Sequence, residues 1–328
     1  MVSKIEIISQ TTFIKTGQVA ILNQQDFVIF DELTSFKELM AFSVFSVTVP
    51  KVIVIHDCNS WFKPTVPKGL KNFLKYTFTR IIKQKFNVFA VAGSNMKRYL
   101  QQNYTGSNVF LIPFRYADFD ELKDTSPRYV PGERIRICVP GTISNRRDYD
   151  KLLNNLCVHH LKDKLLIDIL GKAIGDYGAR IIDRIKVLNN EGFKILFNEG
   201  YINNDSFDES IKQAHIILSD FEPEYVTNNG QKETYGISKE TGVPVLMLNK
   251  AKVGLLPACF NQMLEIVDQT LFFDNGKELA EILVSIYTGT YADFNKLQQN
   301  AVANAKKMDI GLISKEIETA YQVQLNAN

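Results

Sequence analysis

The sequence has few cysteines, and they lie far apart along the chain. Four cysteines occur in 328 residues, at positions 58, 138, 157 and 259, and no Cys-x-x-Cys is present. A disulfide framework or a cysteine-ligated zinc site would need closely spaced sets, so neither is expected. Cys138 lies in the apolar run IRICVPG, where we expect a small buried thiol. This use of cysteine fits a reducing cytoplasm.

Long apolar runs and a one-sided charge are also lacking. No run approaches the roughly 20 residues that span a bilayer, and the opening MVSKIEIISQTT lacks the apolar core of a signal peptide. The formal net charge is only +2, so overall charge implies no partner. No nucleic-acid-binding module is recognisable, and we expect no nucleic-acid partner. The absence of a Gly-x-Gly-x-x-Gly motif and of a P-loop argues against a dehydrogenase or a P-loop kinase.

Short apolar runs alternate with segments of helical period. Because the runs are continuously apolar, they are typical of strands that are covered on both faces, and the alternation predicts parallel α/β sheets. The segments DYDKLLNNLCVHHL and DYGARIIDRIKVLNNEG predict helices. The predicted strands are KIEIIS, QVAILN, DFVIF, KVIVIHD, NVFAVAGS, NVFLIPF, IRICVPG, LLIDILG, FKILFNEG, AHIILSD and PVLMLN.

The alternation is interrupted once, at residues 116–134, a polar stretch with two prolines and a Pro-Gly pair. This composition predicts a linker between two α/β domains, which we place at residues 1–130 and 131–328. The last 35 or so residues predict one or two helices. In open α/β sheets ligands bind beyond the carboxyl ends of strands, so the residues that follow each strand are the candidates for function.

A glycine and two arginines follow the strand IRICVPG. Gly141 permits a tight turn, and Arg146 and Arg147 stand just before a predicted helix. Free amides at a helix N-terminus and the fixed donors of arginine both bind phosphate, which makes a diphosphate site reasonable. The alternative is a solvated arginine pair, with one arginine bonded to Asp148 or Asp150.

Two further strand ends carry charged side chains. Lys172 follows LLIDILG, and the stretch GQKETYGISKETGVPV follows AHIILSD with two glutamates, Glu233 and Glu240. The carboxylates are candidates to accept hydrogen bonds from sugar hydroxyls, and Lys239 is a candidate to meet phosphate. Ser238 is expected to cap a short helix aimed at the same charge. The alternative is a solvated loop without a ligand.

In the first half, the strand KVIVIHD ends in His56, which can titrate near neutrality or donate to a ligand, although a structural His-Asp pair is the alternative. Residues 61–86 contain seven Lys or Arg and no acid, with apolar residues at helical spacing. Such a segment predicts either a helix on an anionic membrane surface or a core-facing helix with a solvated basic face.

Together these parts resemble the GT-B glycosyltransferases, in particular the family 4 (group 1) retaining type, from about Asp26 onward. Gly141 resembles the glycine of the family's Gly-Arg turn, Arg147 stands at the position of its diphosphate-binding lysine, and Arg146 is a substitute for the family arginine that Thr142 replaces. Glu233-Thr-Tyr-Gly236, Glu240 and Gly-Val-Pro-Val resemble the family's Glu-x-Phe-Gly, second glutamate and Gly-x-Pro-Val, with six rather than seven residues between the glutamates.

The resemblance implies two Rossmann-like domains that face each other across a cleft, with an abbreviated N-terminal domain. It implies a hexosyltransferase that uses a UDP- or GDP-sugar without a metal or other cofactor and acts on a glycan or lipid-linked acceptor, as in cell-surface polysaccharide synthesis. A peripheral site at the inner face of the membrane would follow from residues 61–86. The implied catalytic residues are His56 and Glu233, and the implied donor-binding residues are Gly141, Arg146, Arg147, Lys172, Tyr235, Gly236, Ser238, Lys239 and Glu240.

Two other functions fit the same pattern. The short first domain and the altered glutamate spacing suggest a non-catalytic GT-B-like partner subunit that binds a sugar nucleotide or a transferase. A sugar-nucleotide epimerase on the same architecture is a weaker alternative.

Overall fold

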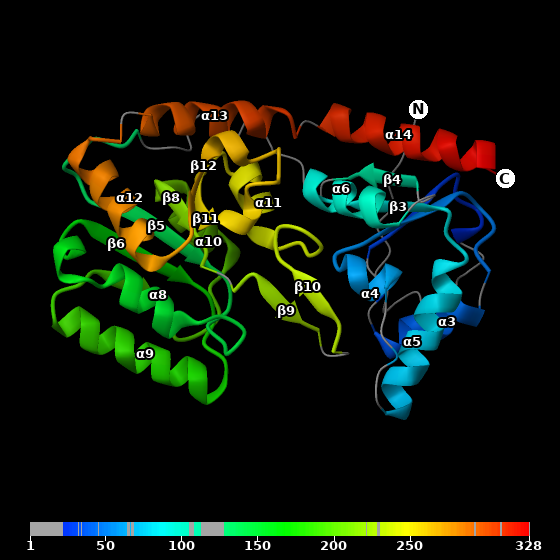
Figure 1. The fold of residues 1–328 in the computed structure, drawn as a ribbon, viewed down its shortest axis with the longest axis horizontal. Helices are drawn as coiled ribbons and strands as arrows, with labels where there is room; N and C mark the ends of the chain where they lie inside the picture. Colours follow the sequence, from blue (N-terminus) through cyan, green and yellow to red (C-terminus); the bar gives the residue numbers. More distant parts are fainter. Residues whose placement is uncertain are drawn as a thin grey trace. The chain divides into compact units, whose positions relative to one another are not determined.

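Buried, continuously apolar strands build two parallel sheets, one in each of two units of the chain (Figure 1). Unit 1 comprises Met1–Phe114, Glu224–Glu240 and Ile310–Asn328, and unit 2 comprises Arg115–Pro223 and Thr241–Asp309. The predicted division at residue 130 treats both domains as contiguous, whereas here two later segments group with the N-terminal part. The computed structural model describes residues 22–31, 33, 35–44, 46–63, 66, 69–104, 108–112, 128–220, 222–227, 230–291, 293–308 and 310–327.

The sheet of unit 1 has four parallel strands in the order β1-β2-β3-β4. Neighbours in the sheet are therefore neighbours along the chain, and the order does not reverse among the described strands. A separate antiparallel pair, β9 and β10, belongs to the same unit and places Glu233 opposite Tyr225. The bounds are β1 Val28–Phe30, β2 Lys51–Val54, β3 Val88–Val91, β4 Asn108–Leu111, β9 Glu224–Val226 and β10 Lys232–Thr234.

Both faces of this sheet are covered, as the continuous apolar runs predict. Ile53 of β2 points into a cluster with residues of the helices that follow the strands. Val52 and Val54 point the other way and pack with Ala320 of the C-terminal helix. The helices of unit 1 are α3 Phe36–Val44, α4 Cys58–Phe62, α5 Leu70–Lys83, α6 Ser94–Asn103 and α14 Ile310–Ala327.

The sheet of unit 2 has six parallel strands in the order β12-β11-β8-β5-β6-β7. Its central strand β5 pairs with β6 on one side and with β8 on the other. The chain therefore runs outward from β5 to β7 and then returns to build the other half from β8. The bounds are β5 Ile135–Pro140, β6 Leu165–Leu170, β7 Ile195–Phe197, β8 Ile216–Leu218, β11 Val253–Pro257 and β12 Thr270–Phe273.

Helices of unit 2 pack on this sheet (Figure 1), and three of them, Tyr149–Leu156, Gly175–Asn190 and Gly276–Thr288, contribute most of the helical residues of one large apolar cluster. The two predicted helices are confirmed, since the first segment forms α8 with a short 3₁₀ turn after it and the second forms α9. The bounds are α8 Tyr149–Leu156, α9 Gly175–Asn190, α10 Asn204–Gln213, α11 Gly242–Asn249, α12 Gly276–Thr288 and α13 Phe294–Lys306, with 3₁₀ turns at His159–Leu161, Ala258–Phe260 and Val267–Gln269.

The predicted strand PVLMLN is wrong, because this run lies in helix α11. Pro244 is tolerated there because it stands in the first turn, where no intrahelical bond needs its missing N–H group. Val243, Met247 and Leu248 are buried, so the helix is apolar enough to have resembled a core strand. The strand that follows is β11, formed by the next apolar run.

Eight of the predicted strands correspond to observed ones, from β1 to β8 in chain order. The predicted strand at residues 4–9, most of the one at 18–23 and the predicted linker up to residue 127 lie outside the described residues. One or two helices were predicted at the C-terminal end, and the structure has two, α13 and α14. All four cysteines are free thiols, and Cys138 is buried as expected. Among the described helices, none is long and apolar enough to cross a membrane.

Candidate functional site

Unit 2 has a topological switch point between β5 and β8. Strand order reverses there, since β5 leads to β6 on one side while β8 lies on the other. In open α/β sheets a crevice opens outside the carboxyl ends of the strands at such a reversal, because the two connecting segments leave in opposite directions. Gly141 follows β5, and Ser219 follows β8.

Two glycines let the segments after β5 and β6 touch. Gly141 has a φ of +116°, in the region that favours glycine. A Cβ placed on Gly171 would lie 1.9 Å from the carbonyl oxygen of Gly141, so no other residue fits at Gly171 without movement of the backbone. The Gly141 amide also donates to Leu170 O at 3.1 Å. The close approach fixes the floor of the crevice.

The guanidinium of Arg147 lies directly over Gly141. Its Nη1 donates to Pro140 O at 2.5 Å, and a Cβ on Gly141 would lie 2.5 Å from the same nitrogen. The hydroxyl of Tyr149 donates to Gly141 O at 2.9 Å. Burial raises the pKa of Tyr149 despite the opposing effect of Arg147, so the phenol stays protonated as a donor. A fixed positive charge therefore stands at the end of β5.

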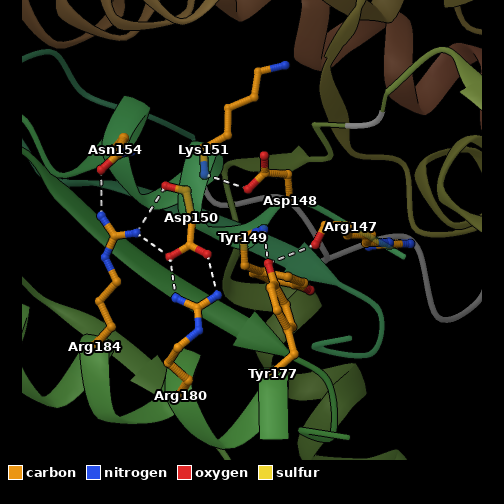
Figure 2. A network of polar contacts seen from close by, with 9 residues as sticks. All are labelled: Arg147, Asp148, Tyr149, Asp150, Lys151, Asn154, Tyr177, Arg180 and Arg184. Atoms are coloured by element: carbon orange, nitrogen blue, oxygen red, sulfur yellow. Dashed lines mark hydrogen bonds and ion pairs between the residues drawn. The ribbon is translucent and has the colours of Figure 1, made fainter. Parts of the chain in front are cut away.

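Helix α8 begins beside this charge, with its N-terminus at the same strand end. Asp148 is its N-cap and accepts from Lys151 N at 2.9 Å. Figure 2 shows that Asp150, in the first turn, is held from α9 by Arg180, with two bonds of 3.0 and 2.6 Å, and by Arg184 at 2.6 Å. The bonds of Arg180 hold the pKa of Asp150 below its ordinary value, against the opposing effect of burial. The network ties the start of α8 to α9.

A buried hydroxyl, that of Ser219 directly after β8, faces this group. Ser219 is 1% exposed, and its Oγ has no hydrogen-bond partner among the described residues. It lines a cavity of about 10 Å³ together with Arg147, Asp148 and Tyr149. This volume is about the room of one water molecule, so a larger anion would bind at the mouth of the cavity and not inside it.

A second hollow of about 190 Å³ lies at the same edge of the sheet, toward β11 and β12. Asp220 borders both hollows, and burial raises the pKa of its carboxyl. Lys151 reaches the larger hollow and bonds to Glu222 at 2.9 Å. Neither Ser219 nor Asp220 was a predicted site residue. Their position directly after a buried strand was the signal that could have identified them.

The remaining predicted residues of unit 2 are at the same edge. Arg146 is exposed and immediately precedes Arg147, and Lys172 is exposed and immediately follows Gly171. The structure thus brings Gly141, Arg146, Arg147 and Lys172 together at the carboxyl ends of β5 and β6. The alternative interpretation was a solvated arginine pair, with one arginine bonded to Asp148 or Asp150. In the structure the carboxylate of Asp150 is bonded to arginines of α9, and that of Asp148 caps α8.

The other predicted residues gather in unit 1, where Glu233 is 1% exposed. Its carboxylate accepts from Asn59 N at 3.2 Å and from Ser60 N at 2.8 Å, at the start of α4. Ser238 Oγ donates to it at 2.7 Å and accepts from Thr234 N at 2.9 Å. Burial raises the pKa of Glu233, and these donors oppose the rise. The expectation that Ser238 caps a helix is wrong, because its hydroxyl is used inside this turn.

Lys239 is held in an aromatic site of the same hairpin. Its ammonium forms an ion pair with Asp57 and lies 4.7 Å from the ring centroid of Tyr225 and 5.8 Å from that of Tyr235. Burial alone would lower the pKa of Lys239, but Asp57 outweighs this and the pKa is raised. Gly236, at φ +73°, makes the turn between the tyrosine and the lysine.

His56 and Glu240 lie next to each other in unit 1. His56 Nε2 is 3.2 Å from Asp31 Oδ1, and the Glu240 amide donates to His56 O at 3.1 Å. Glu240 itself is 8% exposed. The structure therefore groups His56, Glu233, Tyr235, Gly236, Ser238, Lys239 and Glu240 around the ends of β2 and β10. In the described part of the chain, no three His, Cys, Asp or Glu side chains are grouped to hold a metal ion.

Neither a protein-family model nor a curated protein sequence matches the chain. Solved structures do match it. HepE from Anabaena, in complex with UDP and glucose, is 14% identical with a TM-score of 0.65, over 97% of this chain and 84% of that one. A glycosyltransferase from Rickettsia africae is 13% identical with a TM-score of 0.61, over 99% and 85%. A sucrose-phosphate synthase from Thermosynechococcus elongatus is 13% identical with a TM-score of 0.60, over 98% and 81%. At these identities the likeness is one of fold, and it confirms the predicted α/β architecture of two Rossmann-like domains, the GT-B fold.

Proposed function

We propose that the protein is a glycosyltransferase that moves a hexose from a nucleotide-diphosphate sugar to a glycan or lipid-linked acceptor. One observation carries the proposal. A half-buried arginine, a helix N-terminus and the Ser219 hydroxyl, which has no partner among the described residues, meet at the switch point between β5 and β8, in a chain with the GT-B fold. The structure of HepE, which has the same fold, holds UDP and glucose, and this supports the same ligand class here.

In the proposed reaction the site must stabilise a leaving group. When the bond between the anomeric carbon and the diphosphate oxygen breaks, the electron pair stays on the diphosphate and its negative charge grows. The guanidinium of Arg147 and the positive end of the α8 dipole are positioned to stabilise that charge, and exposed Arg146 and Lys172 extend it. In this proposal fixed cationic side chains take the role that a divalent ion has elsewhere.

The finer assignments follow the resemblance to the family 4 type. His56 and Glu233 remain the residues predicted to meet the donor sugar, and retention of the anomeric configuration is part of the proposal. The product's anomeric proton coupling, measured by NMR, distinguishes retention from inversion. An acceptor in cell-surface polysaccharide synthesis and a cytoplasmic location complete the proposal.

Two measurements test this proposal. The protein is incubated with labelled UDP- and GDP-sugars and a membrane lipid extract to detect transfer, and UDP binding is measured by calorimetric titration. Arg147→Ala should weaken UDP binding by about 1.5 to 3 kcal/mol, because a charge-assisted bond to phosphate is lost. Arg134→Ala is the matched control, since Arg134 precedes β5 at the opposite end of the same strand. Equal binding by both variants would remove the Arg147 assignment. Absence of binding, hydrolysis and transfer with every sugar nucleotide would contradict the glycosyltransferase proposal.

The second candidate function is a GT-B-like partner subunit that binds a sugar nucleotide without transferring the sugar. The bonded state of Glu233 favours it, because the carboxylate is buried and occupied by the start of α4 and by Ser238. UDP binding without turnover, together with a stable complex with a catalytic subunit, would support this candidate over the enzyme. Turnover by the purified protein alone would exclude it.

An anionic membrane surface is the partner that we propose for α5. Its last turn faces the core through buried Ile82, while Leu70 and Phe73 near its start are 76% and 46% exposed. Exposed Lys63 and Lys71 flank them. Apolar side chains beside lysines fit a surface of acidic lipids. In this proposal the end of the helix packs in the core and its start contacts the membrane, so the two predicted alternatives apply to different ends.

Flotation with vesicles tests the membrane assignment. Binding should be seen with vesicles of phosphatidylcholine and phosphatidylglycerol, and not with phosphatidylcholine alone. Phe73→Ser should reduce it, whereas Met40→Ser, which changes a residue that is 45% exposed on α3, should not. Equal binding of both variants would contradict a role for α5.

A further inference from the structure

A hydroxyl from another helix bonds to the turn that carries Arg147 on both sides of Asp148. Tyr177, in the first turn of α9, donates through its hydroxyl to Arg147 O at 3.0 Å. The same hydroxyl accepts from Tyr149 N at 2.8 Å (Figure 2). One donor bond and one acceptor bond fix the orientation of the hydroxyl. It therefore acts as a brace that joins the residues before and after Asp148.

The backbone bonds that hold this turn are short in range. The described backbone bonds at these positions are Arg147 N to Ser144 O at 3.1 Å and Tyr149 N to Arg147 O at 3.0 Å. The second spans only two residues and is shared with the Tyr177 bond. The guanidinium leaves the chain at this turn, so a small rotation of the peptide would move its nitrogens away from Gly141 and Pro140.

The start of α9, which is the base of this brace, is itself held by contacts with neighbouring segments. The Tyr177 ring lies 5.1 Å from the guanidinium carbon of Arg180, and Arg180 holds Asp150 of α8 through two parallel bonds. A Cβ on Gly178 would lie 2.9 Å from Ile143 O, so α9 starts in direct contact with the segment that follows β5. The Tyr177 hydroxyl is therefore presented from a fixed helix start.

We propose that Tyr177 is a positioning residue of the diphosphate site, which acts through Arg147 and does not touch the ligand itself. This inference rests on the proposed function, because it concerns how the same site is kept in its binding geometry. The proposal predicts that removal of the Tyr177 hydroxyl lowers the affinity for phosphate, because Arg147 is then no longer held in its binding position. A tyrosine that only stabilised the packing of α9 on α8 would change the thermal midpoint of unfolding and leave affinity alone.

The test is a double-mutant cycle on UDP and inorganic pyrophosphate binding, measured by calorimetry. Tyr177→Phe keeps the ring and removes the hydroxyl, and we expect affinity for both probes to fall by about three- to tenfold, the loss typical of one hydrogen bond. Tyr201→Phe, which changes a tyrosine of unit 2 that is 80% exposed, is the control and should bind as the native protein does. Circular dichroism verifies that each variant is folded.

The cycle separates a positioning role from an independent one. If Tyr177 acts through Arg147, the double variant Arg147→Ala/Tyr177→Phe should bind no more weakly than Arg147→Ala alone. Additive losses, or native affinity in Tyr177→Phe, would overturn the inference while the loss in Arg147→Ala leaves the proposed function in place. No UDP binding by the native protein would overturn both.

A second variant keeps the proposal testable if Tyr177→Phe does not fold. Arg180→Lys retains the charge but replaces the two parallel bonds to Asp150 with at most one, so the base of the brace loosens. We expect the affinity for pyrophosphate to fall by about two- to threefold. Native affinity in this variant would equally contradict the inference.

Discussion

The segment after β5 in unit 2 and the β9–β10 hairpin in unit 1 carry the two motifs that the sequence singles out, and their side chains are used differently. At the first, a hydroxyl from Ser219 has no partner among the described residues and the Arg147 guanidinium lies at a strand end. At the second, Glu233 and Lys239 are paired inside unit 1, with α4 and with Asp57. The same sequence signal, a charged residue after a strand, thus leads to different bonding in the two units, and only the structure shows which partners each residue has.

The largest effect that we expect tests the structural use of Glu233. Glu233→Ala would leave two buried amides at the start of α4 without an acceptor, and should lower the free energy of unfolding by about 4 kcal/mol. Urea titration measures it, with Glu224→Ala, an exposed glutamate of β9, as the control. A loss of transfer activity with unchanged stability would show that Glu233 serves the ligand, and would remove the contrast between the two regions.

The next largest effect concerns the pH dependence of stability, which we expect to differ between the two units. His215 Nδ1 accepts from Arg136 N at 3.0 Å, and burial, followed by the charges of Lys252 and Arg136, lowers its pKa to about 4. Because the unfolded histidine titrates near 6.5, the unfolded state binds more protons between these values, and stability is lost as pH falls from 6.5 to 4. The loss from this one group should be about 3 kcal/mol.

In unit 1 the sign is opposite for Glu233. Burial raises its folded pKa above 4.5, so its contribution is fully present below that value and is lost as pH rises through the folded pKa. Hydrogen exchange of the two sheets at pH 7 and pH 4.5 follows the units separately. His215→Gln should flatten the acid loss in unit 2, and His160→Gln, at an exposed site, should not. An unchanged profile in His215→Gln would assign the acid loss to other groups.

A smaller effect concerns the floor of the crevice. Gly171→Ala places a methyl group 1.9 Å from Gly141 O, so the segments after β5 and β6 must separate. UDP affinity should fall by about tenfold, or 1.4 kcal/mol, because Gly141 and Arg147 move together. Gly200→Ala is the matched control, since nothing lies within 4 Å of the added carbon. Equal affinities would show that the crevice tolerates movement.

The smallest effect is expected at Lys172, which is exposed. Lys172→Ala should weaken UDP binding by about 0.5 kcal/mol at low salt, and by less at high salt, because a solvated charge is screened. Lys194→Ala, at an exposed site before the amino end of β7, is the comparison. A loss as large as that of Arg147→Ala would mean that Lys172 makes a direct bond to the ligand.

Much of the fold was predictable because local signals agreed with tertiary structure. The run IRICVPG is apolar throughout and ends in glycine, and it is the central strand of unit 2 with Gly141 at positive φ. The position of Arg147 was predicted correctly for the same reason, since it lies between a strand end and a helix start. Where a run is apolar on all sides, as in α11, helix and strand give the same pattern, and the sequence favoured the wrong one.

The rest depended on partners that are distant along the chain. Glu233 is bonded to Ser60, 173 residues away, and no local pattern predicts such a bond. The hydroxyls of Tyr149 and Tyr177 have roles that arise only when α8 and α9 pack together. Sequence reasoning located the charged residues at the strand ends, and packing determined the partners of each.

The C-terminal helix gives unit 1 an unusual order of completion during synthesis. Val52 and Val54 leave the ribosome early, but α14, which covers their face of the sheet, is made after the whole of unit 2. At about 5 to 20 residues per second, the stretch between Phe114 and Ile310 takes on the order of ten to forty seconds. Throughout that interval Val52, Val54 and the residues that share their face of the sheet lack their contact with α14, so this apolar face is available to a chaperone.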